Sequence, residues 1–147
     1  MAIVLWEASG LVKRYFREAG SNTVDAIFQA PTVNQMSVTP WGYAFSVTSL
    51  QQEVLVSNQF KVLTIEDDRI LAGLALLVKH NLNSNDAAIL ATYLRFHQSL
   101  PSESPPCLLV AADKHLLRAA EAEGLRTLNP EAAGPQDIAA RMAGGVV

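Results

Sequence analysis

Three short motifs bring acidic side chains to places where metal binding or catalysis would use them. Glu7 and Asp113 each follow a short apolar run typical of a buried strand, and Asp86 lies near the start of a helical pattern. In a parallel α/β sheet the carboxyl ends of the strands open on one crevice, where ligands bind. Three carboxylates there would supply the oxygen ligands that Mg²⁺ prefers. Their crowding should also raise the pKa of at least one of them.

Each acid also has an ordinary structural explanation. Asp and Glu are favoured at helix N-caps and in first turns, where they face the positive end of the helix dipole. Asp113 is a candidate N-cap of the helix that begins at Lys114, and Asp86 is a candidate first-turn acid after Ser84. Taken singly, each acid fits this explanation better than a catalytic one. The placement of two acids at strand ends favours a joint site.

The composition is typical of a folded domain with a mixed surface. Hydrophobic residues make up 50% of the 147 residues, which is enough for a sizeable core. The net charge is -3, so the chain lacks the net positive charge typical of proteins that bind nucleic acid by electrostatic attraction alone. Cations bound at an acidic site would reverse the local sign and could still allow contact with RNA.

Sequence features also bear on the compartment. The single cysteine, Cys107, cannot form an intrachain disulfide and is interpreted as a buried small hydrophobe. The N-terminus lacks the basic region and long apolar stretch of a signal peptide. The longest apolar run, 70–78, is too short to cross a bilayer. We therefore expect a cytoplasmic protein with no membrane partner.

Short apolar runs alternate with helical patterns along the chain. This alternation is typical of an α/β domain with a mainly parallel central sheet flanked by helices. We expect a single domain over 1–130 and a C-terminal tail with a short helix over 131–147. Ser21, Thr64 and either Asn83 or Ser84 are the expected N-caps. The expected strands are 3–6, 37–39, 60–63, 107–111 and 126–128, and the expected helices are 9–17, 21–29, 40–56, 64–79, 84–96 and 113–124.

Three segments, in this order, resemble motifs of the PIN domain family, in particular of VapC-type toxins. The segment 5–15, LWEASGLVKRY, is similar to the opening of these proteins, where an acid precedes a small residue, Ser, a small residue and Leu-Val-Lys-Arg-Tyr. The segment 85–91, NDAAILA, resembles the third acidic motif of the family. The segment 112–120, ADKHLLRAA, resembles the final one.

This resemblance implies a doubly wound parallel sheet and a ribonuclease of toxin–antitoxin type that depends on Mg²⁺ or Mn²⁺. It implies Glu7, Asp86 and Asp113 as metal ligands and catalytic residues. Ser9 would hydrogen-bond Glu7 or a metal-bound water, with a helix N-cap as its alternative role. The cation would activate a water and stabilise charge on the scissile phosphate. RNA is the implied substrate, and an antitoxin protein and a second copy of the chain are the implied partners.

Two positions depart from the family pattern. The first acid of the family is normally Asp, and the extra methylene of Glu7 displaces its carboxylate in a site where Mg²⁺ needs near-octahedral geometry. The second acid is normally Glu, whereas the matching segment 41–45 places Phe45 there. Glu53 lies roughly two helical turns further on and cannot stand in for it. We therefore expect a degenerate site that binds Mg²⁺ or Mn²⁺ weakly.

The other polar candidates are weaker. Lys13, Arg14 and Arg17 could touch phosphates, although a solvated charged face is the favoured interpretation. The three histidines show no metal-ligand spacing such as a helical i, i+4 pair.

Two functions stay open at this point. The first is a VapC-like, metal-dependent ribonuclease with weakened activity, and the retained Asp86 and Asp113 favour it. The alternative is a non-catalytic PIN-like module that binds RNA or a protein partner, and Phe45 favours it. Apolar side chains in the expected third and fourth helices exceed what one core needs, which together with the resemblance predicts a homodimer. These side chains include Trp41, Tyr43 and Leu50.

Overall fold

A parallel sheet forms the centre of the molecule. The computed structural model describes residues 1–40 and 60–143. Its strands are β1 (Ala2–Trp6), β2 (Val33–Val38), β3 (Phe60–Val62), β4 (Cys107–Val110) and β5 (Arg126–Leu128). Their order in the sheet is β3-β2-β1-β4-β5, and every neighbouring pair is parallel. The predicted α/β class is confirmed, and the sheet is wholly parallel over these five strands.

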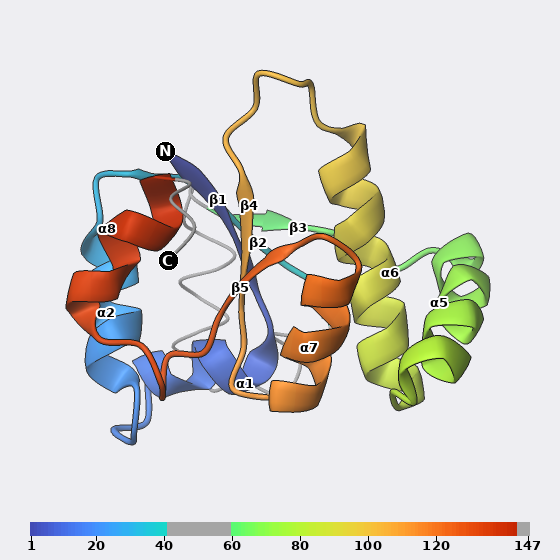
Figure 1. Cartoon of the computed structure of the whole chain (residues 1–147), viewed down its shortest axis with the longest axis horizontal. Helices are drawn as coiled ribbons and strands as arrows, with labels where there is room; N and C mark the ends of the chain where they lie inside the picture. The colour runs from blue at the N-terminus through green and yellow to red at the C-terminus, as the bar shows by residue number, and fades with distance from the viewer. Residues whose placement is uncertain (41–59, 144–147) are drawn as a thin grey trace.

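Helices cover both faces of the sheet. They are α1 (Ala8–Leu11), which continues into a 3₁₀ turn η1 (Val12–Arg14), α2 (Ser21–Gln29), α5 (Asp67–His80), α6 (Ser84–Ser99), α7 (Lys114–Ala122) and α8 (Pro135–Ala143). In Figure 1, α2 and α8 lie on one side of the sheet, and α6 and α7 lie on the other. Helix α5 packs against the outer side of α6. This three-layer arrangement is consistent with the expected PIN-like fold.

The central strands are buried on both faces, which explains their continuous apolar runs. Side chains alternate between the two faces along a strand. In β1, Ile3 and Leu5 join the buried cluster that includes residues of α6 and α7. Val4 and Trp6 join the other cluster, with residues of α2 and α8. Both faces of the sheet are therefore covered where β1 and β4 end, and two of the acids follow these strand ends.

Helix α2 spans the expected residues, but its N-cap differs from the expected one. Ser21 is its first residue, and the N-cap is Gly20, which has a φ of 90°. The Ser21 hydroxyl instead accepts from the Glu18 amide and donates to the Phe16 carbonyl. A Cβ at position 20 would lie 2.7 Å from the carbonyl of Pro130, so both the backbone angle and the space require glycine.

Helix α5 and the first helix also depart from their expected bounds, whereas α6 begins at the expected residue. Thr64 is not an N-cap, because the Leu63 amide still donates to the Val38 carbonyl (2.8 Å) and keeps the chain extended. Glu66 takes the N-cap position of α5. Of the two candidates for α6, Asn83 is the cap, and its side chain accepts from the Asp86 amide. The first helix is shorter than the expected 9–17 and ends in the 3₁₀ turn.

Further features complete the described fold. Helix α8 packs on α2 and buries Ile138 and Met142. Cys107 is buried, as expected, and burial raises the pKa of its thiol to about 11. Over the ranges that the structure describes, no helix is long and apolar enough to cross a membrane. The expected helix 40–56, with Trp41, Tyr43, Leu50 and the position of Phe45, lies outside the described residues except at its first residue.

Candidate functional site

The junction between β1 and α1 fixes the first acid. Glu7 directly follows Trp6, the last residue of β1, and is the N-cap of α1. Its Oε2 accepts hydrogen bonds from the Ser9 amide (2.8 Å) and from the Ser9 hydroxyl. Ser9 therefore holds the Glu7 carboxylate by two bonds, and Glu7, not Ser9, caps the helix.

The junction between β4 and α7 holds another acid in a similar way. Asp113 is the N-cap of α7, and its Oδ1 accepts from the amides of His115 (2.7 Å) and Leu116 (3.1 Å). The N-cap interpretation of Asp113 is thus confirmed. A capping carboxylate commits one oxygen to the backbone and leaves the other available, so this role does not exclude ligand binding.

These two junctions are joined by hydrogen bonds and by close packing. The Glu7 amide donates to the Val110 carbonyl (3.1 Å), and the Ala112 amide donates to the Ser9 hydroxyl oxygen (2.9 Å). A Cβ on Gly10 would lie 2.7 Å from the Val110 carbonyl oxygen. A residue larger than glycine would therefore push α1 away from the end of β4. The motif that carries Glu7 is locked onto the strand that leads to Asp113.

Asp86 comes to the same end of the molecule from a helix. In Figure 1, the starts of α6 and α7 and the short helix α1 all lie toward the lower end of the molecule. Asn83 and Asp86 bond each other twice, because Asn83 Nδ2 donates to Asp86 Oδ2 (2.7 Å) and the Asp86 amide donates to Asn83 Oδ1 (2.9 Å). The buried Tyr93 hydroxyl of α6 also donates to the Trp6 carbonyl, just before Glu7.

The three acids influence one another electrostatically. Burial raises the pKa of Asp86, and the negative charges of Asp113 and then Glu7 raise it further. The hydrogen bond from Asn83 opposes this rise without cancelling it. The expected rise in the pKa of one acid is therefore found at Asp86, with burial as the larger cause and repulsion from the charges of Asp113 and Glu7 as the smaller one.

The donor set suits a hard divalent cation, although the acids do not form a closed cage. Among hydrogen bonds from described residues, none reaches Glu7 Oε1, Asp86 Oδ1 or Asp113 Oδ2. Within the same ranges, no three His, Cys, Asp or Glu side chains are arranged as a metal-binding group. Mg²⁺ commonly keeps several waters and uses only one or two protein carboxylates. The oxygens fit such an open, water-rich site and not one that surrounds the ion.

The basic residues of the first helix have structural partners. Lys13 is only 3% exposed, and its Nζ contacts Glu131 (2.8 Å) and Glu18 (3.0 Å). The favoured interpretation of a solvated charged face is therefore wrong for Lys13. Burial opposes its charge, but the bonds with Glu131 and Glu18 outweigh burial and raise the pKa of its ammonium group. Its buried stem and paired head make it a link between η1 and the chain after β5.

Arg14 and Arg17 converge on a single acid. Arg14 Nη1 lies 2.8 Å from Asp25 Oδ1, and Arg17 Nη1 lies 2.7 Å from Asp25 Oδ2. These two bonds hold the pKa of Asp25 below its ordinary value, with the Arg14 bond as the largest cause. The pairs tie η1 and the chain just after it to α2, which gives both arginines a structural role.

Sequence reasoning missed a contact between α5 and the end of α7. His80 Nε2 lies 2.6 Å from Glu123 Oε1, and Lys79 Nζ lies 2.7 Å from the same oxygen. His115 Nε2 contacts the His80 carbonyl oxygen (2.8 Å). These contacts join residues from distant parts of the chain, so no local pattern indicates them. The sequence also carries no local signal for the contact of Gly10 with Val110.

Comparisons with known proteins add no family assignment. No protein-family model matches this chain, and a search of curated proteins finds no match either. The fold and the positions of the acids are therefore described from the structure itself, and the PIN resemblance stays a prediction that the three motifs carry.

Proposed function

We propose that this protein is a VapC-like ribonuclease of the PIN type with a weakened divalent-metal site. One observation supports the proposal most strongly. Glu7, Asp86 and Asp113 approach one another closely enough for the first and last to raise the pKa of Asp86. Carboxylates gathered in this way repel one another, and a bound cation is the simplest means of relieving that repulsion.

Each residue has a distinct part in the proposed site. Glu7, Asp86 and Asp113 would hold Mg²⁺ or Mn²⁺ through their remaining oxygens. When bound, the cation lowers the pKa of a coordinated water and neutralises charge on the scissile phosphate. Ser9 orients Glu7, and Asn83 orients Asp86. Because Asp86 binds a cation only when deprotonated, metal affinity should fall as the pH drops through its raised pKa.

The chemistry of two positions makes the proposed site weak. Glu7 has a longer side chain than the expected Asp, and Phe45 stands where the resemblance places an acid. The formal charge of the acid set is then near -3 in place of -4. Fewer charged ligands lower divalent affinity. A displacement of about 1 Å at a reacting centre can cost ~100-fold in rate.

A non-catalytic module that binds RNA or protein is the second candidate. The chemistry of Phe45, which cannot ligate a metal, favours it. The ribonuclease proposal further includes a homodimer, an antitoxin partner and a cytoplasmic location. Sedimentation that shows only monomer at high micromolar concentration would contradict the dimer.

The deciding experiment is RNA cleavage by the purified chain with Mn²⁺, with Mg²⁺ and with EDTA. We expect slow cleavage that requires the cation and disappears in Asp86→Asn. The matched control is Asp67→Asn, because Asp67 is an exposed first-turn acid of the adjacent helix α5. Cleavage that survives Asp86→Asn would overturn the site. Complete absence of cleavage with retained RNA binding would favour the non-catalytic module.

A further inference from the structure

A polar pocket lies away from the acids, beside the edge strand β3. It has a volume of about 370 Å³ and lies between the end of β3, the start of α5 and the second half of α6. This volume is within the usual range for small-ligand sites. Five of the lining residues carry the argument: Lys61, Thr64, Arg69, Arg95 and Phe96.

The charge in this pocket is positive although the chain is acidic. Lys61, Arg69 and Arg95 line it, against the single carboxylate Glu66. Arg69 bonds Asp68, but neither Lys61 nor Arg95 forms an ion pair with any residue that the structure describes. By contrast, several of the other cations have a carboxylate partner. Two cations in one cavity, neither with an ion-pair partner among the described residues, indicate a ligand that is an anion.

The arrangement of Lys61 also favours an anion. Its Nζ lies 5.2 Å from the centre of the Phe96 ring, so a cation–π contact restrains the ammonium group. Arg95 is exposed, and its planar guanidinium offers paired donors that match phosphate oxygens. The Thr64 hydroxyl, also exposed, adds a neutral donor of the kind often used at nucleic-acid backbones.

We infer that this pocket binds a phosphate group, and that the source of the phosphate is the backbone of a single-stranded RNA. The choice of RNA rests on the proposed function, whereas the choice of phosphate rests on the lining. Arg95 lies nine positions after Asp86 on α6, or about 14 Å along the helix axis, and the two residues face different sides of the helix. The pocket is therefore a second attachment point for the strand, apart from the acids.

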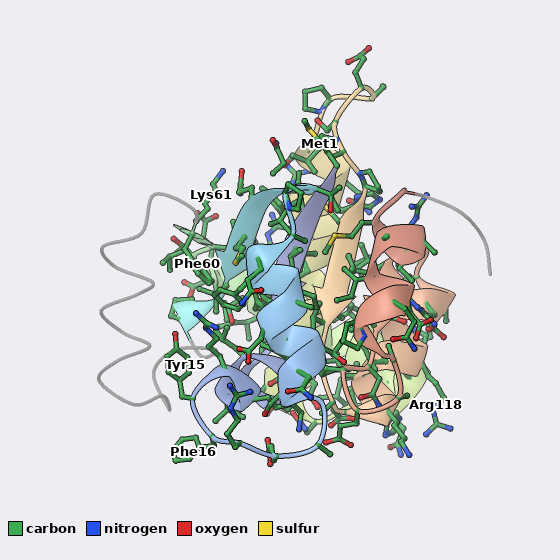
Figure 2. All side chains as sticks on the ribbon, turned by 90° about the vertical axis from the view of Figure 1, so that its left-hand side faces the viewer. Met1, Tyr15, Phe16, Phe60, Lys61 and Arg118 are labelled. Carbon is green, nitrogen blue, oxygen red and sulfur yellow. The ribbon has the colours of Figure 1, made fainter. Side chains whose placement is uncertain are left out.

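The test is RNA affinity in EDTA, measured by fluorescence anisotropy with a labelled single strand of about 10 nucleotides. The variant Lys61→Gln/Arg95→Gln removes the charges of Lys61 and Arg95 from the pocket. The matched control, Arg118→Gln/Arg126→Gln, removes the same charge from exposed positions on α7 and β5. Figure 2 shows Lys61 and Arg118 on opposite sides of the molecule. Melting curves check that both variants stay folded.

We expect the pocket variant to bind RNA roughly 10-fold or more weakly, as for lost charge-assisted hydrogen bonds. The slope of log affinity against log salt should become shallower by about 1.4, because two phosphate contacts are lost. The control should change neither quantity, and Lys61→Arg/Arg95→Lys should retain most of the affinity.

Three results would overturn the inference. They are an equal loss of RNA affinity in the pocket variant and the control variant, an unchanged RNA affinity in the pocket variant, or no RNA binding by the natural protein. Competition by a mononucleotide as strong as that by the oligonucleotide would reassign the phosphate to a small ligand and overturn the RNA source. The natural protein could bind RNA in EDTA through Lys61 and Arg95 and yet cleave no RNA in Mn²⁺. That result would support this inference and refute the ribonuclease proposal.

Discussion

Gly10→Ala tests whether the contact between α1 and the end of β4 positions the acids. The added Cβ would lie 2.7 Å from the Val110 carbonyl oxygen, and ordinary contact begins near 3.4 Å, so α1 must move by about 3.4 − 2.7 = 0.7 Å. Two hydrogen bonds cross this contact, from the Glu7 amide to Val110 and from the Ala112 amide to Ser9. Losing both removes about 2 kcal/mol.

Alanine has a better helix propensity than glycine, which stabilises the helix by up to about 1 kcal/mol. The free energy of unfolding should therefore fall by a net amount of about 1–2 kcal/mol. For a chain of this size that corresponds to a fall of roughly 2–8 °C in the melting temperature, measured by circular dichroism. Gly134→Ala is the control, because its Cβ meets only the flexible side chain of the exposed Gln136. An unchanged melting temperature in Gly10→Ala, or an equal fall in the control, would refute the reasoning.

Three further predictions concern ionisable groups. Asp86→Asn should raise the free energy of unfolding at neutral pH, because the raised pKa of Asp86 means that its ionisation opposes folding. This gain should vanish below about pH 4, where the natural protein and the variant both carry a neutral side chain at position 86. Urea titrations across pH measure the difference. Lys13→Met should lower the free energy of unfolding by about 1 kcal/mol at neutral pH. This difference should shrink above the ordinary lysine pKa of 10.5, because the pKa of Lys13 is raised in the fold, and a constant difference would contradict its ion pairs. The Cys107 thiol, with a pKa of about 11, should react with a thiol reagent only in urea, and rapid reaction of the native protein would contradict its burial.

Much of the fold could be predicted because the sheet is parallel and buried on both faces. Such strands appear as apolar runs, and the alternation of runs with helical patterns indicated the α/β class before any coordinates. The helix starts were harder to predict. Gly20, which has a left-handed backbone, takes the N-cap position that was expected for its neighbour Ser21. The Leu63 amide still pairs with β2, so the next helix begins after Glu66 and not at Thr64.

For the candidate site, too, some features could be predicted from the sequence and others could not. The positions of Glu7 and Asp113 could be predicted because each acid follows a recognisable strand, and adjacent parallel strands end at one edge. The contacts that hold them could not. Lys13 was expected to face solvent, yet its partner Glu131 is 118 residues away in the chain. Likewise, nothing local to Gly10 indicates that Val110 lies against it.

The central claim is that Glu7, Asp86 and Asp113 form a weak site for a divalent cation. Calorimetric titration of the metal-free protein with Mn²⁺ tests it directly, without requiring an RNA substrate. We predict millimolar binding that Asp86→Asn abolishes, Asp67→Asn leaves unchanged and Phe45→Glu tightens. Binding that is indifferent to Asp86→Asn, or no binding in either the natural protein or Phe45→Glu, would contradict the claim.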